Sequence, residues 1–230
     1  YRTIFNFLTN DMSAFYLDFA KDIVYIETAN STDRRRMQTV MYEILVKLTK
    51  LLVPIVPHTS EEIWTYLEQE EEAYAYLTEM PSADVIPDAA EILDFWSAFL
   101  EFRTGVHKAL EMARDEKVIG KSLEASVMVY PDEAVKVLLA SVAETEDVAT
   151  LLIVSELIVS DQAAPEDAVK VGDTAITVNH AVGGVCQRCR RIDESVGTNA
   201  NAHLVELCEH CASIVTLEFP EAAAEGFESK

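Results

Sequence analysis

The sequence predicts a mainly α-helical protein, in which an antiparallel helix bundle is followed by a small α/β region and a compact module built on four cysteines. Apolar residues recur at spacings of three and four through the first half of the chain, which is the period of an amphipathic helix. After Gly120 the pattern changes to short β-prone runs separated by turns. The four cysteines of the chain then form two Cys-x-x-Cys pairs near its end. These three observations define the predicted fold class.

The N-terminal half is predicted to contain four helices. The first has one apolar face, built from Phe5, Leu8, Met12, Phe15, Tyr16 and Phe19. The second is expected to begin at the capping residues 30–33 and to end before Pro54, because proline cannot continue a helix. Thr59 and Glu62 fit a capping box for a third helix, and a fourth is expected over about residues 89–116. Helices connected in this way predict an antiparallel bundle.

The region after Gly120 is predicted to be a small α/β domain. Residues 125–130 read as a strand that ends at Pro131, and helices are expected over about 132–141 and 144–151. Further β-prone runs cover residues 152–154, 156–159, 168–171 and 174–179.

The predicted domain organisation has four parts: residues 1–118, 119–182, 183–218 and 219–230. An acidic run at 68–72 suggests a long connection within the first part. Gly183 and Gly184 suggest a flexible joint before the cysteine module. The tail from Pro220, rich in alanine and glutamate, is expected to be frayed.

The cysteine pairs predict a metal site. Cys186 and Cys189 are separated from Cys208 and Cys211 by eighteen residues. Two such pairs can supply the four soft ligands of a closed, tetrahedral Zn²⁺ site, so we expect one structural zinc in a four-cysteine, zinc-ribbon-like module.

Other states of these cysteines stay open at this point. Two disulfides or four reduced core thiols are alternatives, although no secretory segment argues for an oxidising compartment. His210 lies between two predicted ligands and could replace one of them.

Two clusters of basic residues are candidates for contacts with nucleic acid. Arg188, Arg190 and Arg191 surround Cys189 on a chain whose formal charge is −22. Arginine suits such contacts because its planar fork binds phosphate and can stack on a base. The second cluster lies at the start of the second predicted helix and contains Arg34, Arg35, Arg36 and, one turn later, Gln38. In both clusters, pairing with nearby carboxylates is the alternative.

The composition excludes several function classes. The acidic balance argues against general affinity for nucleic acid, since counterion release needs clustered lysine and arginine. No apolar run is long enough for a membrane span. The sequence contains no glycine-rich phosphate loop after a strand and no nucleophile elbow. Because the metal site would be closed, the sequence favours binding over catalysis.

Several stretches together resemble the C-terminal part of bacterial isoleucyl-tRNA synthetases. Residues 11–18 with Lys21 and Asp22 are similar to a segment of that family's anticodon-binding helical domain. Residues 30–39 and 58–64 match further pieces, residues 120–125 resemble the start of the junction region, and the cysteine pairs match the C-terminal zinc finger. The chain starts at Tyr1, without an initiator methionine, which is expected of a piece of a longer protein.

This resemblance implies a role in holding the anticodon stem-loop of an isoleucine-accepting tRNA. Aminoacylation, with its ATP and Mg²⁺, would take place in a catalytic core that is absent here, so this piece alone is expected to carry no catalytic site. Its partners would be tRNA and the remainder of the synthetase, in the cytoplasm, without DNA or membrane. The resemblance places RNA contacts at Arg34, Arg35 and Gln38, and the arginine cluster beside Cys189 adds Arg188, Arg190 and Arg191 as expected contacts. The family commonly has a tryptophan at the position of Arg190, where it stacks on an anticodon base, and a guanidinium plane can also stack.

Two other functions are compatible with the residues. A zinc-ribbon module on a helical scaffold could bind protein rather than RNA, and the acidic composition favours this. A DNA-repair enzyme with the same type of finger is the third possibility, but no catalytic amine or acid arrangement is visible for it.

Overall fold

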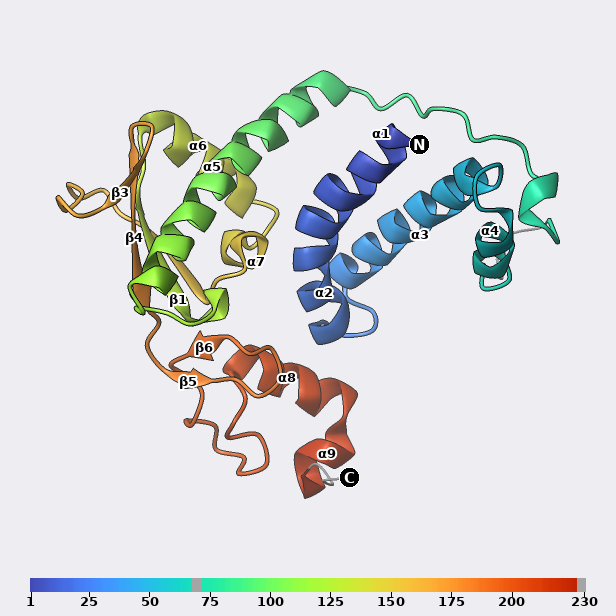
Figure 1. Ribbon diagram of the computed structural model, residues 1–230. Coiled ribbons are helices and arrows are strands. Elements are labelled where there is room, and N and C mark those ends of the chain that lie inside the picture. Colours follow the sequence, from blue (N-terminus) through green and yellow to red (C-terminus); the bar gives the residue numbers. More distant parts are fainter. Residues whose placement is uncertain (68–71, 227–230) are drawn as a thin grey trace. The chain divides into compact units, whose positions relative to one another are not determined.

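The computed structural model describes residues 1–67 and 72–226, and these divide into two compact units (Figure 1). One unit comprises Tyr1–Thr28 and Asp88–Lys230, and the other comprises Ala29–Pro87. Most of the acidic run, residues 68–71, lies outside the described residues, as do residues 227–230 of the tail. The four-part division made from the sequence stays a prediction.

A four-stranded mixed sheet forms the centre of the first unit. Its strands are β1 (Ala125–Tyr130), β2 (Glu156–Val159), β3 (Val169–Val171) and β4 (Thr174–His180), in the order β2-β1-β4-β3. β1 pairs with β2 in parallel and with β4 in antiparallel register, and β3 pairs with β4 in antiparallel register. A short 3₁₀ turn, η3 (Ser122–Glu124), precedes β1, whose bounds match the strand predicted from the sequence.

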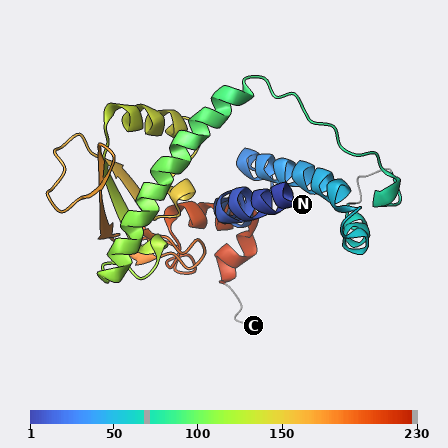
Figure 2. The same cartoon turned by 45° about the horizontal axis from the view of Figure 1, so that its top comes forward.

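Three helices cover one face of this sheet. They are α5 (Ala89–Asp115), α6 (Glu133–Ala143) and α7 (Val148–Leu152). Figures 1 and 2 both show α5 running obliquely across the strands. At Gly105 the approach is so close that an added Cβ would lie 2.4 Å from a methyl carbon of Val171. Val127, Val129 and Ile176 are fully buried in the core.

The β-prone run at residues 152–154 does not form a strand. Asp147 caps α7 by accepting a hydrogen bond from the Ala149 amide, so the helix continues to Leu152. Ile153 then takes a left-handed conformation with φ of 58° and ends the helix. Capping therefore overrides the β propensity of this run.

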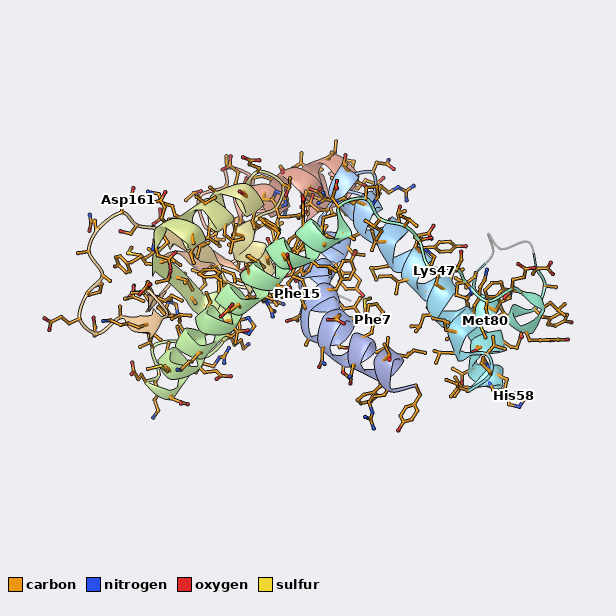
Figure 3. The ribbon with its side chains drawn as sticks, turned by 90° about the horizontal axis from the view of Figure 1, so that it is seen from above. Phe7, Phe15, Lys47, His58, Met80 and Asp161 are labelled. Carbon is orange, nitrogen blue, oxygen red and sulfur yellow. The ribbon has the colours of Figure 1, made fainter. Side chains whose placement is uncertain are left out.

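The N-terminal segment packs against α5. It consists of α1 (Arg2–Asn6), the π-helical segment η1 (Phe7–Tyr16) and α2 (Leu17–Ile26). Phe15 lies between this segment and α5 (Figure 3), with its ring centroid 6.4 Å from that of Trp96. The predicted apolar face is only partly correct, because Phe5 is exposed. Phe5 lies in α1, near the start of the chain, whereas the predicted apolar residues within η1 are buried or half-buried.

The second unit contains α3 (Thr32–Leu52), α4 (Pro57–Trp64) and the 3₁₀ turn η2 (Ala75–Leu77). Ser31 caps α3 as the sequence predicts, since its side chain accepts a hydrogen bond from the Arg34 amide. The predicted capping box at Thr59 was wrong. α4 already begins at Pro57, because proline suits the first helical position. Trp64, Leu67 and Ala75 form the buried core of this unit.

The cysteine module completes the first unit. It contains β5 (Gly184–Val185), β6 (Ile192–Asp193), α8 (Glu209–Glu218) and α9 (Pro220–Glu225). Gly183, expected to be a flexible joint, instead permits close backbone approach. Its φ is 125°, and an added Cβ would lie 2.4 Å from the Asp193 carbonyl group. The tail is not frayed over residues 220–225, which form α9 and bury Ala223.

The predicted fold class is confirmed: the N-terminal part is mainly helical, and a small mixed sheet and a four-cysteine module follow it. The sequence did not predict that α5 would cover the sheet. Among residues 1–67 and 72–226, none of the helices combines the length and the apolar character needed to cross a bilayer.

Candidate metal centre and nucleic-acid interface

The first cysteine pair lies on the turn between β5 and β6. Val185 pairs with Ile192, and the backbone amide of Cys186 donates a 2.9 Å hydrogen bond to the Arg191 carbonyl. The Arg190 amide donates back to the Cys186 carbonyl at 2.9 Å, and Arg190 has φ of 67°. These bonds close a tight turn around Cys189.

The second pair lies at the start of α8. Cys208 is the N-cap residue, and Cys211 lies in the first turn of the helix. The Cys208 amide donates to the sulfur of Cys186 at 3.3 Å, which joins the two pairs through an N–H···S contact. Leu204, Leu207 and Val215 bury this region together with the cysteines.

The four sulfur atoms lie within 4.8 Å of one another. All four cysteines are free, and the sulfurs of Cys189 and Cys208 are 3.8 Å apart. Thiolates at the usual Zn–S distance of about 2.3 Å stand roughly 3.8 Å apart at the corners of a tetrahedron. The separation is far too long for a disulfide. The cluster could therefore hold a metal ion such as zinc.

Hydrogen bonds within the cluster shift the pKa values of its thiols in opposite directions. A hydrogen bond with Cys189 lowers the pKa of the Cys186 thiol, and the same bond raises the pKa of Cys189. The pKa of Cys211 is also raised, first by its hydrogen bond with Cys186. Four thiolates this close repel one another unless a cation balances their charge, so the donor set suits a divalent ion.

His210 is not part of the sulfur cluster. Its Nε2 lies 2.9 Å from the Oε1 atom of Glu27, and its side chain is 58% exposed. Because α8 turns this ring away from the sulfurs, the four cysteines alone form the candidate ligand set among the described residues.

Arg188 makes its contacts inside the protein. Its Nη2 donates a hydrogen bond to the Ile26 carbonyl at 2.6 Å and a longer one to the Tyr25 carbonyl at 3.5 Å. Its Nη1 lies 3.9 Å from the sulfur of Cys211. The guanidinium therefore lies between the cysteine cluster and the C-terminal end of α2.

Arg191 contacts α7 and the residue that caps it. Its Nη1 forms an ion pair with Asp147 at 3.1 Å, and its Nη2 donates to the hydroxyl of Thr150. Burial raises the pKa of Asp147, but hydrogen bonds from Thr150 and Arg191 outweigh it and hold this pKa below the ordinary value.

Arg190 is the exposed member of the three. Its side chain donates a 2.8 Å hydrogen bond to Oε1 of Gln187, which is also exposed. The backbone at Arg190 is left-handed, with φ of 67°. Its guanidinium face is thus available to a partner outside the chain.

The other three predicted contact residues lie on α3, in the second unit. Arg35 is exposed and its Nη1 donates to Gln38 at 3.4 Å. Arg34 is partly buried, and Arg36 pairs with Asp33 at 3.4 Å. The structure thus brings Arg35 and Gln38 together, while the cysteine module contains the other three arginines.

Sequence reasoning missed the partners of the module arginines. Ile26 is 162 positions away from Arg188, and Asp147 is 44 positions away from Arg191. No local pattern marks the first contact. The N-cap position of Asp147 could have marked a carboxylate fixed at a helix start, but not its partner.

Comparison with known protein families defines the class of this chain. Residues 1–129 match the family described as the anticodon-binding domain of tRNA ligase, and the chain belongs to this family. The individual relatives define the class more narrowly than the family model does.

The chain is 60% identical over 231 residues to the isoleucine–tRNA ligase of Lactococcus lactis subsp. lactis (strain IL1403). This match covers 99% of the chain and 25% of that protein. It is 58% identical over 229 residues to the isoleucine–tRNA ligase of Streptococcus sanguinis (strain SK36), covering 100% of this chain and 24% of that protein. The chain thus spans about a quarter of the length of the curated relatives it matches, and corresponds to their C-terminal part. The resemblance drawn from the sequence is confirmed.

Proposed function

We propose that this chain holds the anticodon stem-loop of an isoleucine-accepting tRNA, as the C-terminal part of an isoleucine–tRNA ligase. The observation that carries the proposal is the family match over residues 1–129, together with relatives that are isoleucine–tRNA ligases. The complete enzyme would join isoleucine to its tRNA in the cytoplasm, using ATP and Mg²⁺ in a catalytic core outside this chain.

The proposal includes one structural Zn²⁺ held by Cys186, Cys189, Cys208 and Cys211. The mutual spacing of the sulfurs supports it. An ion bound to four thiolates has no open position for a substrate, so it would supply rigidity rather than chemistry. This rigidity would fix the backbone that carries the three module arginines.

Arg190 is the residue that we assign to a base of the anticodon loop. It is exposed and its guanidinium face is free to stack, a contact worth about 1–3 kcal/mol per base by alanine substitution. Arg34, Arg35 and Gln38 are assigned to the RNA from α3. Arg188 and Arg191 would contact RNA only through N–H groups left over from their internal bonds, since a guanidinium has five donors.

The acidic composition restricts how the RNA can bind. At a formal charge of −22 the chain as a whole repels a polyanion, so affinity has to come from local arginines and from stacking. The same acidity favours the second candidate, a module that binds protein. Salt dependence distinguishes the two, because only binding to RNA releases counterions from phosphates.

The test is a fluorescence titration of the chain against isoleucine tRNA and a tRNA with another anticodon, at two ionic strengths. We expect tighter binding of isoleucine tRNA and a steep loss of affinity with salt. Equal, salt-insensitive binding of both tRNAs would favour the protein-binding candidate.

The role of Arg190 is tested in the same titration. The Arg190→Ala variant should weaken binding of isoleucine tRNA about tenfold or more, the loss expected for one stacked base. Arg114→Ala, which removes an exposed arginine of α5 that donates to the Ser122 hydroxyl, is the matched control and should have little effect. An equal loss for the two tRNAs would remove the base-reading role of Arg190.

A further inference from the structure

The C-terminal end of α2 is capped by a residue from the cysteine module. Arg188 donates to the carbonyls of Ile26 and Tyr25, which lie in the last turn of the helix. The carbonyls of a last turn have no partner within their own helix, and they form the negative end of the helix dipole. A guanidinium at this position both satisfies these acceptors and opposes their charge.

A second contact lies beside the first. His210 reaches Glu27, which is the C-cap residue of α2. The side chain of Ile26 packs against the core that contains the cysteines. We call these contacts of Arg188, His210 and Ile26 the α2 anchor. Arg188 and His210 each lie next to a predicted metal ligand, so the ion that orders those ligands would also order the anchor.

The anchor lies close to the boundary between the two units. Thr28 is the last residue of the first segment of unit 1, and Ala29 is the first residue of unit 2. Ser31 then caps α3, the helix that carries Arg34 and Arg35. The chain therefore leaves the anchored end of α2 and enters the predicted RNA-binding helix within a few residues of Glu27.

We propose that Arg188 and His210 are positioning residues, which transmit metal binding in the cysteine cluster to the end of α2 and so fix the point where the chain departs for α3. This role differs from the direct RNA contact predicted for Arg188. The expected effect on RNA affinity rests on the proposed function, whereas the expected effect on the order of α2 does not. Without the anchor, the last turn of α2 would have to be ordered when the RNA binds, and affinity would fall.

Hydrogen exchange tests the structural part without RNA. In the zinc-loaded chain, Arg188→Ala should speed exchange of the amides of residues 24–27 about tenfold, the size expected for losing a charged hydrogen bond. Its zinc content should stay near that of the wild type. Arg190→Ala, which alters the neighbouring arginine without touching α2, is the matched control and should leave this segment unchanged.

Removal of the metal gives the decisive comparison. A chelator should speed exchange at residues 24–27 in the wild-type chain, and should add less at these residues in Arg188→Ala, because the variant has already lost one of the restraints that the ion would order. Additive effects, or no effect of Arg188→Ala, would overturn the proposal. His210→Ala provides a second variant if Arg188→Ala does not fold, and Arg188→Lys should restore part of the protection.

Titration with tRNA separates the anchor from a phosphate contact. If Arg188 positions α2, its alanine variant should lose affinity while the log–log salt slope stays the same. If it instead contacts a phosphate, the slope should fall by about one and exchange at residues 24–27 should not change. Failure of all variants and the wild type to bind tRNA would refute the proposed function, yet the exchange result would still decide the anchor.

Discussion

The two arginine clusters of this protein are built in different ways. On α3, Arg35 follows a helix N-terminus capped by Ser31, and its side chain bonds to Gln38 one turn later. In the cysteine module, three arginines within four positions lie on a tight turn that also carries two of the four clustered cysteines. The first cluster thus rests on local helix geometry, whereas the second rests on a candidate metal site.

This difference determines what each arginine can do. On a helix, residues three or four positions apart share a face, so Arg35 lies beside Gln38, whereas Arg34 next to it is partly buried. The three arginines of the turn lie in three different environments. Arg188 caps α2, Arg191 pairs with Asp147, and Arg190 is exposed to solvent. A cluster of arginines in a sequence is therefore not a measure of the charge available to a partner.

Loss of one sulfur ligand should have the largest effect and should separate the two clusters. Cys211→Ser removes one of four thiolates, and structural zinc contributes an apparent binding free energy of about 10–16 kcal/mol in zinc-finger peptides. We expect metal analysis to fall from about one Zn²⁺ per chain to nearly none, and residues 184–217 to lose protection from hydrogen exchange.

The second unit should stay folded in this variant, because its core of Trp64, Leu67 and Ala75 contains no cysteine. Ser213→Ala, on the exposed side of the same helix, is the matched control and should keep its metal. A Cys211→Ser variant that remains ordered over residues 184–217 would show that the module does not depend on a metal.

The converse change should affect the helix-borne cluster alone. Trp64 is 4% exposed, and its Nε1 donates to the Glu72 carbonyl at 2.8 Å. Replacing a buried aromatic residue by alanine typically costs about 3–5 kcal/mol, so Trp64→Ala should destabilise the second unit by that order. Chemical denaturation followed by hydrogen exchange would measure the loss, and zinc content should not change.

Tyr66→Ala is the control for this experiment. Tyr66 lies two residues further along the chain and is 79% exposed, so its replacement should have a small effect. If Trp64→Ala also released the metal, the two units would be more strongly coupled than their separate cores indicate.

Local sequence patterns predicted the elements that depend on local physics. The strand over residues 125–130, the Ser31 cap and the spacing of the cysteine pairs each follow from neighbouring residues. Packing between distant segments was not predictable in this way. The packing of α5 on the sheet depends on the close contact between Gly105 and Val171. Nothing in the sequence near either residue indicates that the two are in contact.

The same limit applies to the candidate site. The four cysteines indicate one shared metal site, because the chemistry and the spacing of two Cys-x-x-Cys pairs are specific. Arginines carry no such signal, since their long side chains reach partners anywhere on the surface. Arg188 finds its acceptor on α2 and Arg191 finds Asp147, and only the folded chain brings these groups together.

Replacement of Arg191 should have the smallest effect on the free energy of unfolding. The pH dependence of this effect tests whether Arg191 stabilises the fold through its ion pair with Asp147. Asp147 is more than half exposed, so its ion pair with Arg191 should contribute less than about 1 kcal/mol. The pKa of Asp147 lies below its ordinary value of 3.8 in the folded chain. A lowered folded pKa gives stability that is present above the unfolded pKa and is lost as pH falls through the folded pKa.

Arg191→Ala should therefore lower the free energy of unfolding at neutral pH, and the difference from the wild type should shrink below about pH 4. Urea denaturation at a series of pH values would measure it. Asp147→Asn keeps a residue suited to the N-cap of α7 but removes the charge, so adding Arg191→Ala to it should have a smaller effect than in the wild type. A difference that is independent of pH would mean that the guanidinium acts through packing and not through its charge.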